Sequence, residues 1–189
     1  DVVWTFAIAI VVLGMSAAIF GHWLERAGPR KAGFAAAVAW GGGLIVTSFG
    51  VSTHQLWLIW LGAGVIGGLG LGLGYISPVS TLIKWFPDRR GLATGMAIMG
   101  FGGGAMIGMP LGDSLINTYG IAQTFLIMGV IYFIAMTIGA FGYRVPANSW
   151  KPKGWKSPVK KANSMISTNH VHVSTAHKTP QFWLLWGVL

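Results

Sequence analysis

Two long uncharged runs joined by a short basic loop constrain this chain more than any other feature. Residues 56–83 and 92–111 are predominantly apolar and contain no charged side chain. Each run reaches the roughly 20 residues that a helix needs to cross a bilayer. Lipid offers the backbone no hydrogen-bond partners, so an uncharged run of this length forms a helix or part of a closed barrel. The stretch therefore predicts two membrane-spanning helices joined by residues 84–91.

Glycines recur at intervals of four within both runs. Residues four apart lie on one face of a helix, and a column of glycines there lets another helix backbone approach closely. The spacing is the same for a static packing face and for a face that slides during function, so both interpretations stay open. The expected packing faces are formed by Gly64, Gly68 and Gly72 in the first run and by Gly100, Gly104 and Gly108 in the second.

The composition extends this prediction to the whole chain. Of the 189 residues 53% are hydrophobic and 9% charged, whereas an ordinary soluble domain has about 25% charged residues. Further apolar spans cover residues 2–20, 32–49 and 121–143, and a sixth begins at residue 181. We therefore expect an all-α polytopic membrane protein. Because the chain starts and stops within apolar segments, we also expect a fragment cut at both ends.

The basic residues predict how the spans are oriented. All 13 Lys and Arg fall in residues 21–31, 84–91 and 144–180, and the loops 50–55 and 113–120 contain none. Successive helices alternate in direction, so the three basic segments share one side of the bilayer, which is the cytoplasmic side. The net charge of +9 comes from these short loops and not from a basic face with interleaved aromatics, so no nucleic-acid partner is expected.

The predicted organisation has three parts. Residues 1–143 form a transmembrane half, residues 144–180 a basic cytoplasmic linker, and residues 181–189 the start of the next helix. The linker contains four prolines and no acidic residue. Its charge is explained by topology alone or by contact with anionic lipid, which attracts basic segments near the surface.

Two acidic residues lie within the basic segments. Asp88 follows a proline and is placed to cap the next helix. Glu25 lies where the first helix ends, an unfavourable place for a carboxylate. We therefore expect Glu25 to form a specific ion pair, with a solvated loop carboxylate as the alternative.

Catalytic and metal-binding patterns are weak in this sequence. His170 and His172 have no further strong ligands nearby, so no metal site is expected, and no cofactor is predicted. Without cysteines the chain has no thiol nucleophile or zinc finger. The spans hold no paired carboxylates or Ser/His/Asp set, which argues against an enzyme.

A few polar and aromatic residues within the spans are candidates for substrate contact. Tyr75 is the first of these, because it follows a run of glycines and precedes Pro78. Helix packing is the alternative role for Tyr75. Tyr132 and Gln123 are further candidates, and so is Trp4, which also suits an interfacial anchor.

The segment 21–31 resembles the signature loop between the second and third helices of the major facilitator superfamily. Its Gly21, Arg26, Gly28 and Arg30 match the family pattern, while Glu25 stands in place of the usual Asp. The Arg-x-Gly-Pro-Arg form is similar to the oxalate/formate antiporter family within it. Residues 84–93, the Gly-Phe-Gly-x-Gly at 100–104 and residues 178–186 are similar to that family too.

This resemblance implies a fold and an activity. The spans would be helices 2 to 6 and the start of helix 7 of a twelve-helix transporter, so the fold would be the N-terminal six-helix half lacking helix 1. The activity would be secondary active transport of small carboxylates such as oxalate, formate, lactate or pyruvate in a bacterial inner membrane. A non-transporting carboxylate sensor is the alternative function. The expected partners are a small carboxylate, the bilayer and the missing C-terminal half.

The resemblance also assigns roles to residues. Substrate would bind at the midplane between two halves that rock around it. The loop with Gly21 and Gly28 would gate this motion through Glu25 and Arg26, with Arg30 or Arg89 as partners. No span interior supplies Lys, Arg or His, and an unpaired carboxylate in a low dielectric is costly. We therefore expect the cation that binds the substrate in the missing half.

Overall fold

The computed structural model describes residues 2–147, 150, 152, 173–176 and 178–188. It divides into two compact units, Asp1–Lys153 and Gly154–Leu189. Every regular element among the described residues is a helix. The first unit contains α1 (Val3–Ala27), α2 (Pro29–Ser52), α3 (Leu56–Ile59), the π-helical segment η1 (Trp60–Ile66), α4 (Gly67–Trp85), α5 (Arg90–Tyr119) and α6 (Ile121–Gly142). The second contains α7 (Val173–Ala176) and α8 (Pro180–Val188).

Five helices of the first unit are long and apolar enough to cross a membrane. They are α1, α2, the continuous rod Leu56–Trp85 made of α3, η1 and α4, and then α5 and α6, and they contain 22 to 30 residues each. These are the five spans predicted from the sequence. The predicted linker, residues 144–180, and His170 and His172 lie largely or wholly outside the described residues. α8 occupies the predicted start of the sixth span.

Two of the predicted loops are instead helical. α1 continues to Ala27 and α2 begins at Pro29, so the expected polar turn over 21–31 is reduced to Gly28. In the same way α5 continues to Tyr119, and Gly120 alone separates it from α6. Gly28 and Gly120 have φ angles of 85° and 81°, a region that glycine enters without steric cost. The polar residues continue their helices beyond the apolar core, which the loop prediction missed.

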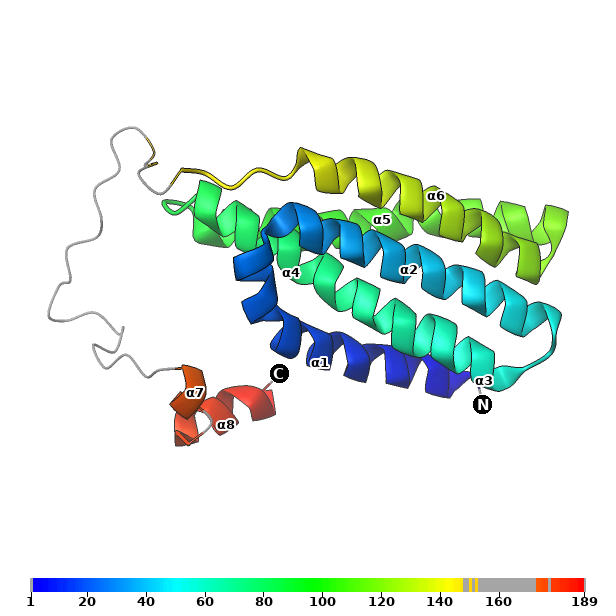
Figure 1. Ribbon diagram of the computed structural model, residues 1–189, viewed down its shortest axis with the longest axis horizontal. Helices are drawn as coiled ribbons and strands as arrows, with labels where there is room; N and C mark the ends of the chain where they lie inside the picture. The colour runs from blue at the N-terminus through cyan, green and yellow to red at the C-terminus, as the bar shows by residue number, and fades with distance from the viewer. Residues whose placement is uncertain (1, 148–149, 151, 153–172, 177, 189) are drawn as a thin grey trace, which may run out of the picture. The chain divides into compact units, whose positions relative to one another are not determined.

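α2 is the central helix of this unit. Figure 1 shows it between α6 and α4, with α1 beyond α4. Its buried face is made of small residues, including Ala32, Ala36 and Ala37, so neighbouring backbones come close. A Cβ atom added to Gly43 would lie 2.6 Å from the carbonyl oxygen of Gly62 in η1. On the other side, the Ser48 hydroxyl donates a hydrogen bond of 2.6 Å to the Ala122 carbonyl of α6.

The first glycine column packs against α1. A Cβ atom at Gly64 would lie 3.0 Å from the Ile8 side chain, and one at Gly68 would lie 2.8 Å from the Ala9 carbonyl oxygen. At Gly72 it would overlap the Ser16 hydroxyl. These three glycines therefore form the groove in which α1 lies.

The second glycine column has a different environment from the one expected. Around Gly100 and Gly104 no atom of a neighbouring helix lies within 4 Å of an added Cβ atom, and at Gly108 only the hydroxyl end of Tyr132 does. Within the described part of the chain Gly100 and Gly104 therefore meet no neighbouring helix, and Gly108 meets only the Tyr132 side chain of α6. They border an open space between α5 and its neighbours.

Candidate functional site

A cavity of about 600 Å³ lies between α2, α4, α5 and α6. Gly104 and Gly108 of α5 form part of its wall, and Trp40, Tyr75 and Tyr132 contribute its largest polar side chains. Trp40, Gly104 and Tyr132 each lie near the middle of a spanning helix. The cavity therefore lies about midway along these spanning helices.

Aromatic contacts hold the tyrosine rings at this cavity. The rings of Trp40 and Tyr132 meet edge to face with centroids 6.3 Å apart, and Tyr75 meets Phe101 in the same manner at 6.3 Å. Such pairs stabilise ring orientation beyond the effect of burial alone. A Cβ atom at Gly108 would lie 2.5 Å from the Tyr132 hydroxyl oxygen, so this glycine leaves the room that the hydroxyl occupies.

The cavity wall offers hydrogen-bond donors but no charged group. Among the described residues, neither the Tyr75 nor the Tyr132 hydroxyl has a hydrogen-bond partner, so both are available to a ligand. All of the residues that line the cavity are uncharged. This wall can orient an anion through hydroxyl groups and aromatic edges, but it cannot neutralise the anion's charge.

Two of the four predicted substrate contacts line the cavity and two do not. Tyr75 and Tyr132 both line the cavity. Trp4 lies in the first turn of α1 with 63% of its surface exposed, and Gln123 lies exposed in the first turn of α6. Both are at helix ends and neither lines the cavity.

Sequence reasoning missed Trp40 and Phe101 as wall residues. Trp40 offered a signal, because it lies in the middle of its span whereas interfacial tryptophans lie near span ends. Phe101 is flanked by Gly100 and Gly102, and this spacing exposes its ring.

The predicted gate residues lie at the end of the unit that carries Gly28 and residues 86–89, here called the basic end. Glu25 and Arg26 are exposed in the last turns of α1, and Gly21 lies within that helix. The predicted ion pair of Glu25 is absent from the described residues, in which the ion pair formed is Arg89 with Asp88 at 3.7 Å. The predicted cap is also wrong, because α5 has no side-chain cap and Asp88 pairs with Arg89 instead.

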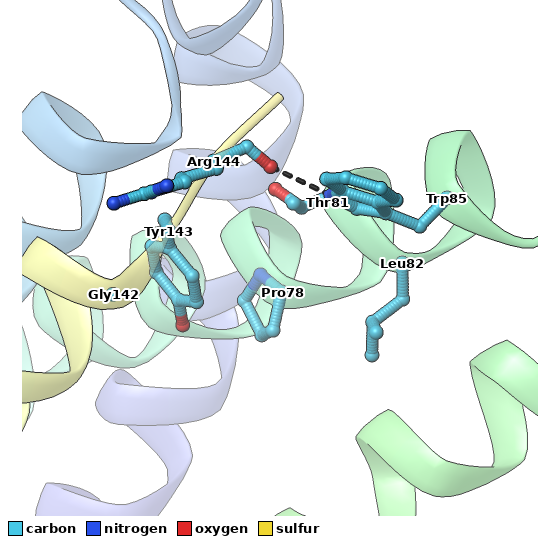
Figure 2. A pocket seen from close by; sticks show the side chains of 7 residues that line it. All are labelled: Pro78, Thr81, Leu82, Trp85, Gly142, Tyr143 and Arg144. Atoms are coloured by element: carbon cyan, nitrogen blue, oxygen red, sulfur yellow. Dashed lines mark hydrogen bonds between the residues drawn. The ribbon is translucent and has the colours of Figure 1, made fainter. Parts of the chain in front are cut away.

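Arg30 has a partner that the sequence did not indicate. Its Nε donates a hydrogen bond of 2.6 Å to the carbonyl of Tyr143, just beyond α6. Next to it, the Trp85 indole donates to the Arg144 carbonyl at 2.7 Å, beside a cavity of about 380 Å³ that both residues line (Figure 2). The chain leaving α6 is thus tied to both α2 and α4.

Comparison with known families decides the classification. The sequence model of the Major Facilitator Superfamily matches residues 1–189. The chain belongs to the major facilitator superfamily. It is an integral, multi-pass membrane protein of this superfamily, and the all-α fold predicted from the sequence is confirmed.

The relatives of this superfamily chain are transporters. It is 29% identical to the MFS-type transporter YhjX of Escherichia coli over 98% of the chain and 43% of the relative. It is 28% identical to the oxalate:formate antiporter of Oxalobacter formigenes, over 88% of the chain and 37% of the relative. It is also 28% identical to monocarboxylate transporter 2 of Meriones unguiculatus, over 97% of the chain and 35% of the relative. The predicted resemblance is confirmed, and the chain spans less than half the length of these curated relatives.

Proposed function

We propose that the complete protein is a secondary transporter of small carboxylates and that the described helices form one wall of its substrate site. The observation that carries this proposal is the uncharged cavity at mid-depth, with the Tyr75 and Tyr132 hydroxyls free to donate. Relatives named for oxalate, formate and monocarboxylates support the same substrate class. Because these relatives are named as transporters, they favour flux over the alternative of a sensor.

The proposed binding mode assigns separate tasks to the two halves. The tyrosine hydroxyls donate hydrogen bonds to the carboxylate oxygens, while Trp40 and Phe101 form the apolar wall. The cation that balances the substrate's charge comes from the other half, because this wall has none and an unpaired buried carboxylate is costly. The substrate is therefore held only when the two halves face each other across it.

Alternating access follows from rocking of the two halves around this site. The close glycine contacts of α2 with η1 and of α4 with α1 make this half a rigid body. At the basic end, Glu25 and Arg26 are exposed and free to contact the other half, and Arg89, exposed at the same end, is a further gate residue. We place this end on the cytoplasmic side of a bacterial inner membrane, as the distribution of Lys and Arg indicates.

Counterflow with the full-length protein in proteoliposomes tests the proposal. Vesicles are loaded in turn with oxalate, formate, lactate or pyruvate, and entry of each labelled acid is followed. Exchange that requires a loaded acid identifies an antiporter, and uptake driven by a proton gradient alone identifies a symporter. Absence of flux with all four acids, in protein shown to be folded, would refute carboxylate transport.

The role of Tyr75 is tested by Tyr75→Phe, which removes only the hydroxyl. A hydrogen bond to a charged group contributes about 1.5–3 kcal/mol, so KM should rise about tenfold or more. Tyr119→Phe is the matched control, since Tyr119 is exposed at the end of α5 and its removal should leave KM unchanged. Equal effects of the two changes would exclude a direct contact from Tyr75.

The open space beside α5 gives a second test. Leucine at Gly104 meets no atom within 4 Å of its Cβ and extends into the cavity. Gly104→Leu should therefore abolish transport while the protein remains in the membrane at its normal level. Loss of the variant from the membrane would instead indicate that Gly104 is needed for packing.

A further inference from the structure

A second cavity, of about 530 Å³, lies at the basic end where α1, α2 and the segment after α6 meet. Three cationic side chains line it: Arg30 and Lys31 from the first turn of α2, and Arg144 from the chain that leaves α6. Its remaining wall is uncharged and includes Pro29 and Val145. A cationic rim thus adjoins an apolar wall.

The three cations are not neutralised by the part of the protein that the structure describes. No acidic residue lines the cavity, and none of the three side chains takes part in an ion pair among the described residues. Like charges gathered around one hollow repel one another unless an anion joins them. Their arrangement therefore favours a bound anion.

One of these cations is held by a hydrogen bond from its side chain, and a second follows a backbone segment that is itself anchored. Arg30 uses its Nε to bind the Tyr143 carbonyl at 2.6 Å, which leaves the four N–H groups of its terminal amines for a ligand. The backbone of Arg144 is anchored where its carbonyl accepts a hydrogen bond of 2.7 Å from the Trp85 indole. Figure 2 shows the Arg144 guanidinium extending to the side opposite Trp85.

Tyr143 contributes a neutral side chain to the wall of this cavity. A Cβ atom added to Gly33 would lie 2.9 Å from its ring, so α2 leaves just enough room for it. Burial raises the pKa of the Tyr143 hydroxyl, which therefore stays protonated at neutral pH. No negative charge from this residue opposes an anion in the cavity.

We propose that this cavity binds a phosphate group, with Arg30, Lys31 and Arg144 as its cationic ligands. Arginine presents paired N–H groups that match phosphate oxygens, and lysine adds a point charge. The cavity lies at the ends of the spanning helices, at headgroup depth, where basic pockets between helices bind anionic lipids. The phosphate comes from an anionic phospholipid headgroup or from a soluble phosphate, and the experiment separates these sources.

The test compares two double variants of the full-length protein that remove the same charge. Lys31→Gln/Arg144→Gln empties the cavity of two cations while keeping Arg30, its bond to Tyr143 and the Arg144 backbone. Lys84→Gln/Arg90→Gln removes two exposed cations from the neighbouring basic loop, and neither lines the cavity. Binding of phosphatidylglycerol and phosphatidylcholine is measured in detergent by native mass spectrometry, and the effect of inorganic phosphate by competition.

We expect the unmodified protein to retain one phosphatidylglycerol and the cavity variant to bind it about 30-fold more weakly. The loop variant should keep the unmodified affinity. Competition by millimolar inorganic phosphate would assign the site to soluble phosphate, and its failure to compete would assign it to lipid. Equal weakening in both variants, or equal binding of phosphatidylcholine, would overturn the proposal, since either result reflects general attraction to a basic surface.

Discussion

Replacing Gly43 with alanine should destabilise the protein by about 1–3 kcal/mol, the usual cost of overpacking a tight interior. The added methyl carbon would lie 2.6 Å from the Gly62 carbonyl oxygen and 2.8 Å from the Gly67 backbone nitrogen. Ordinary contact begins at 3.4 Å, so α2 and η1 must separate by about 0.8 Å (3.4 − 2.6) at this crossing. Both opposing atoms belong to the backbone, so no side chain can rotate away to relieve the contact.

Gly42→Ala provides a matched control on the neighbouring residue. No atom lies within 4 Å of a Cβ atom added to Gly42, and the change in helix propensity is the same. Alanine in the middle of a helix is favoured over glycine by about 0.5–1 kcal/mol. Gly42→Ala should therefore be as stable as the unmodified protein or slightly more stable.

The assay is unfolding of the two full-length variants in detergent, followed by thermal denaturation and by titration with a denaturing detergent. A loss of 1–3 kcal/mol lowers the ratio of folded to unfolded protein by about 5- to 150-fold. Only Gly43→Ala should show this loss of stability. If both variants unfold like the unmodified protein, the backbones at this crossing are not in contact. If both variants are destabilised equally, the loss of stability is a general effect of substitution in this helix and not of the contact at Gly43.

Two further predictions concern α2 and the cavity wall. Ser48→Ala removes the hydrogen bond to the Ala122 carbonyl and should lower the free energy of unfolding by about 0.6 kcal/mol, and by at most about 1.7 kcal/mol. Ser52→Ala is the control, because the Ser52 hydroxyl bonds within its own helix. Equal unfolding of the two variants would contradict the prediction. Gly108→Ala places a methyl group 2.5 Å from the Tyr132 hydroxyl oxygen and displaces that ring. Transport assays should show a raised KM with unfolding unchanged, and an unaltered KM would argue against Tyr132 as a substrate contact.

The five spans could be predicted because membrane insertion depends on local sequence. The length of an uncharged apolar run is sufficient to identify a span. The ends of the helices could not be predicted in the same way. Glu25 and Arg26 are polar and suggest a loop, yet α1 continues through both. Polarity marks where the apolar core ends, and a helix can extend past that point until a glycine such as Gly28 turns the chain.

The two glycine columns show that spacing alone does not predict which helix a glycine face contacts. Gly68 and Gly104 lie in columns with the same spacing, but one meets the Ala9 backbone and the other meets no atom within 4 Å. Periodicity predicts that a groove exists, and only the packing of other helices determines what lies in it. Gly104 therefore lies in a cavity wall, which its sequence context did not indicate.

The candidate site was predicted in the same partial way. Tyr75 stood out because glycines surround it, and it does line the cavity with Tyr132. Trp4 and Gln123 share the chemical character of these residues but lie in the first turns of their helices, far from mid-depth. Position along the span would have separated the two pairs and would also have selected Trp40.

The turn at Gly120 has a consequence for how the protein is made. Among the described spans, the apolar stretch of α5 is less hydrophobic than that of α6, so α5 partitions less readily from the insertion machinery into lipid. Only one residue separates the two, and it holds a backbone conformation, φ 81°, that strains any side chain. α5 and α6 can therefore leave the translocon together as a closed hairpin, in which the more apolar helix carries the less apolar one into the bilayer.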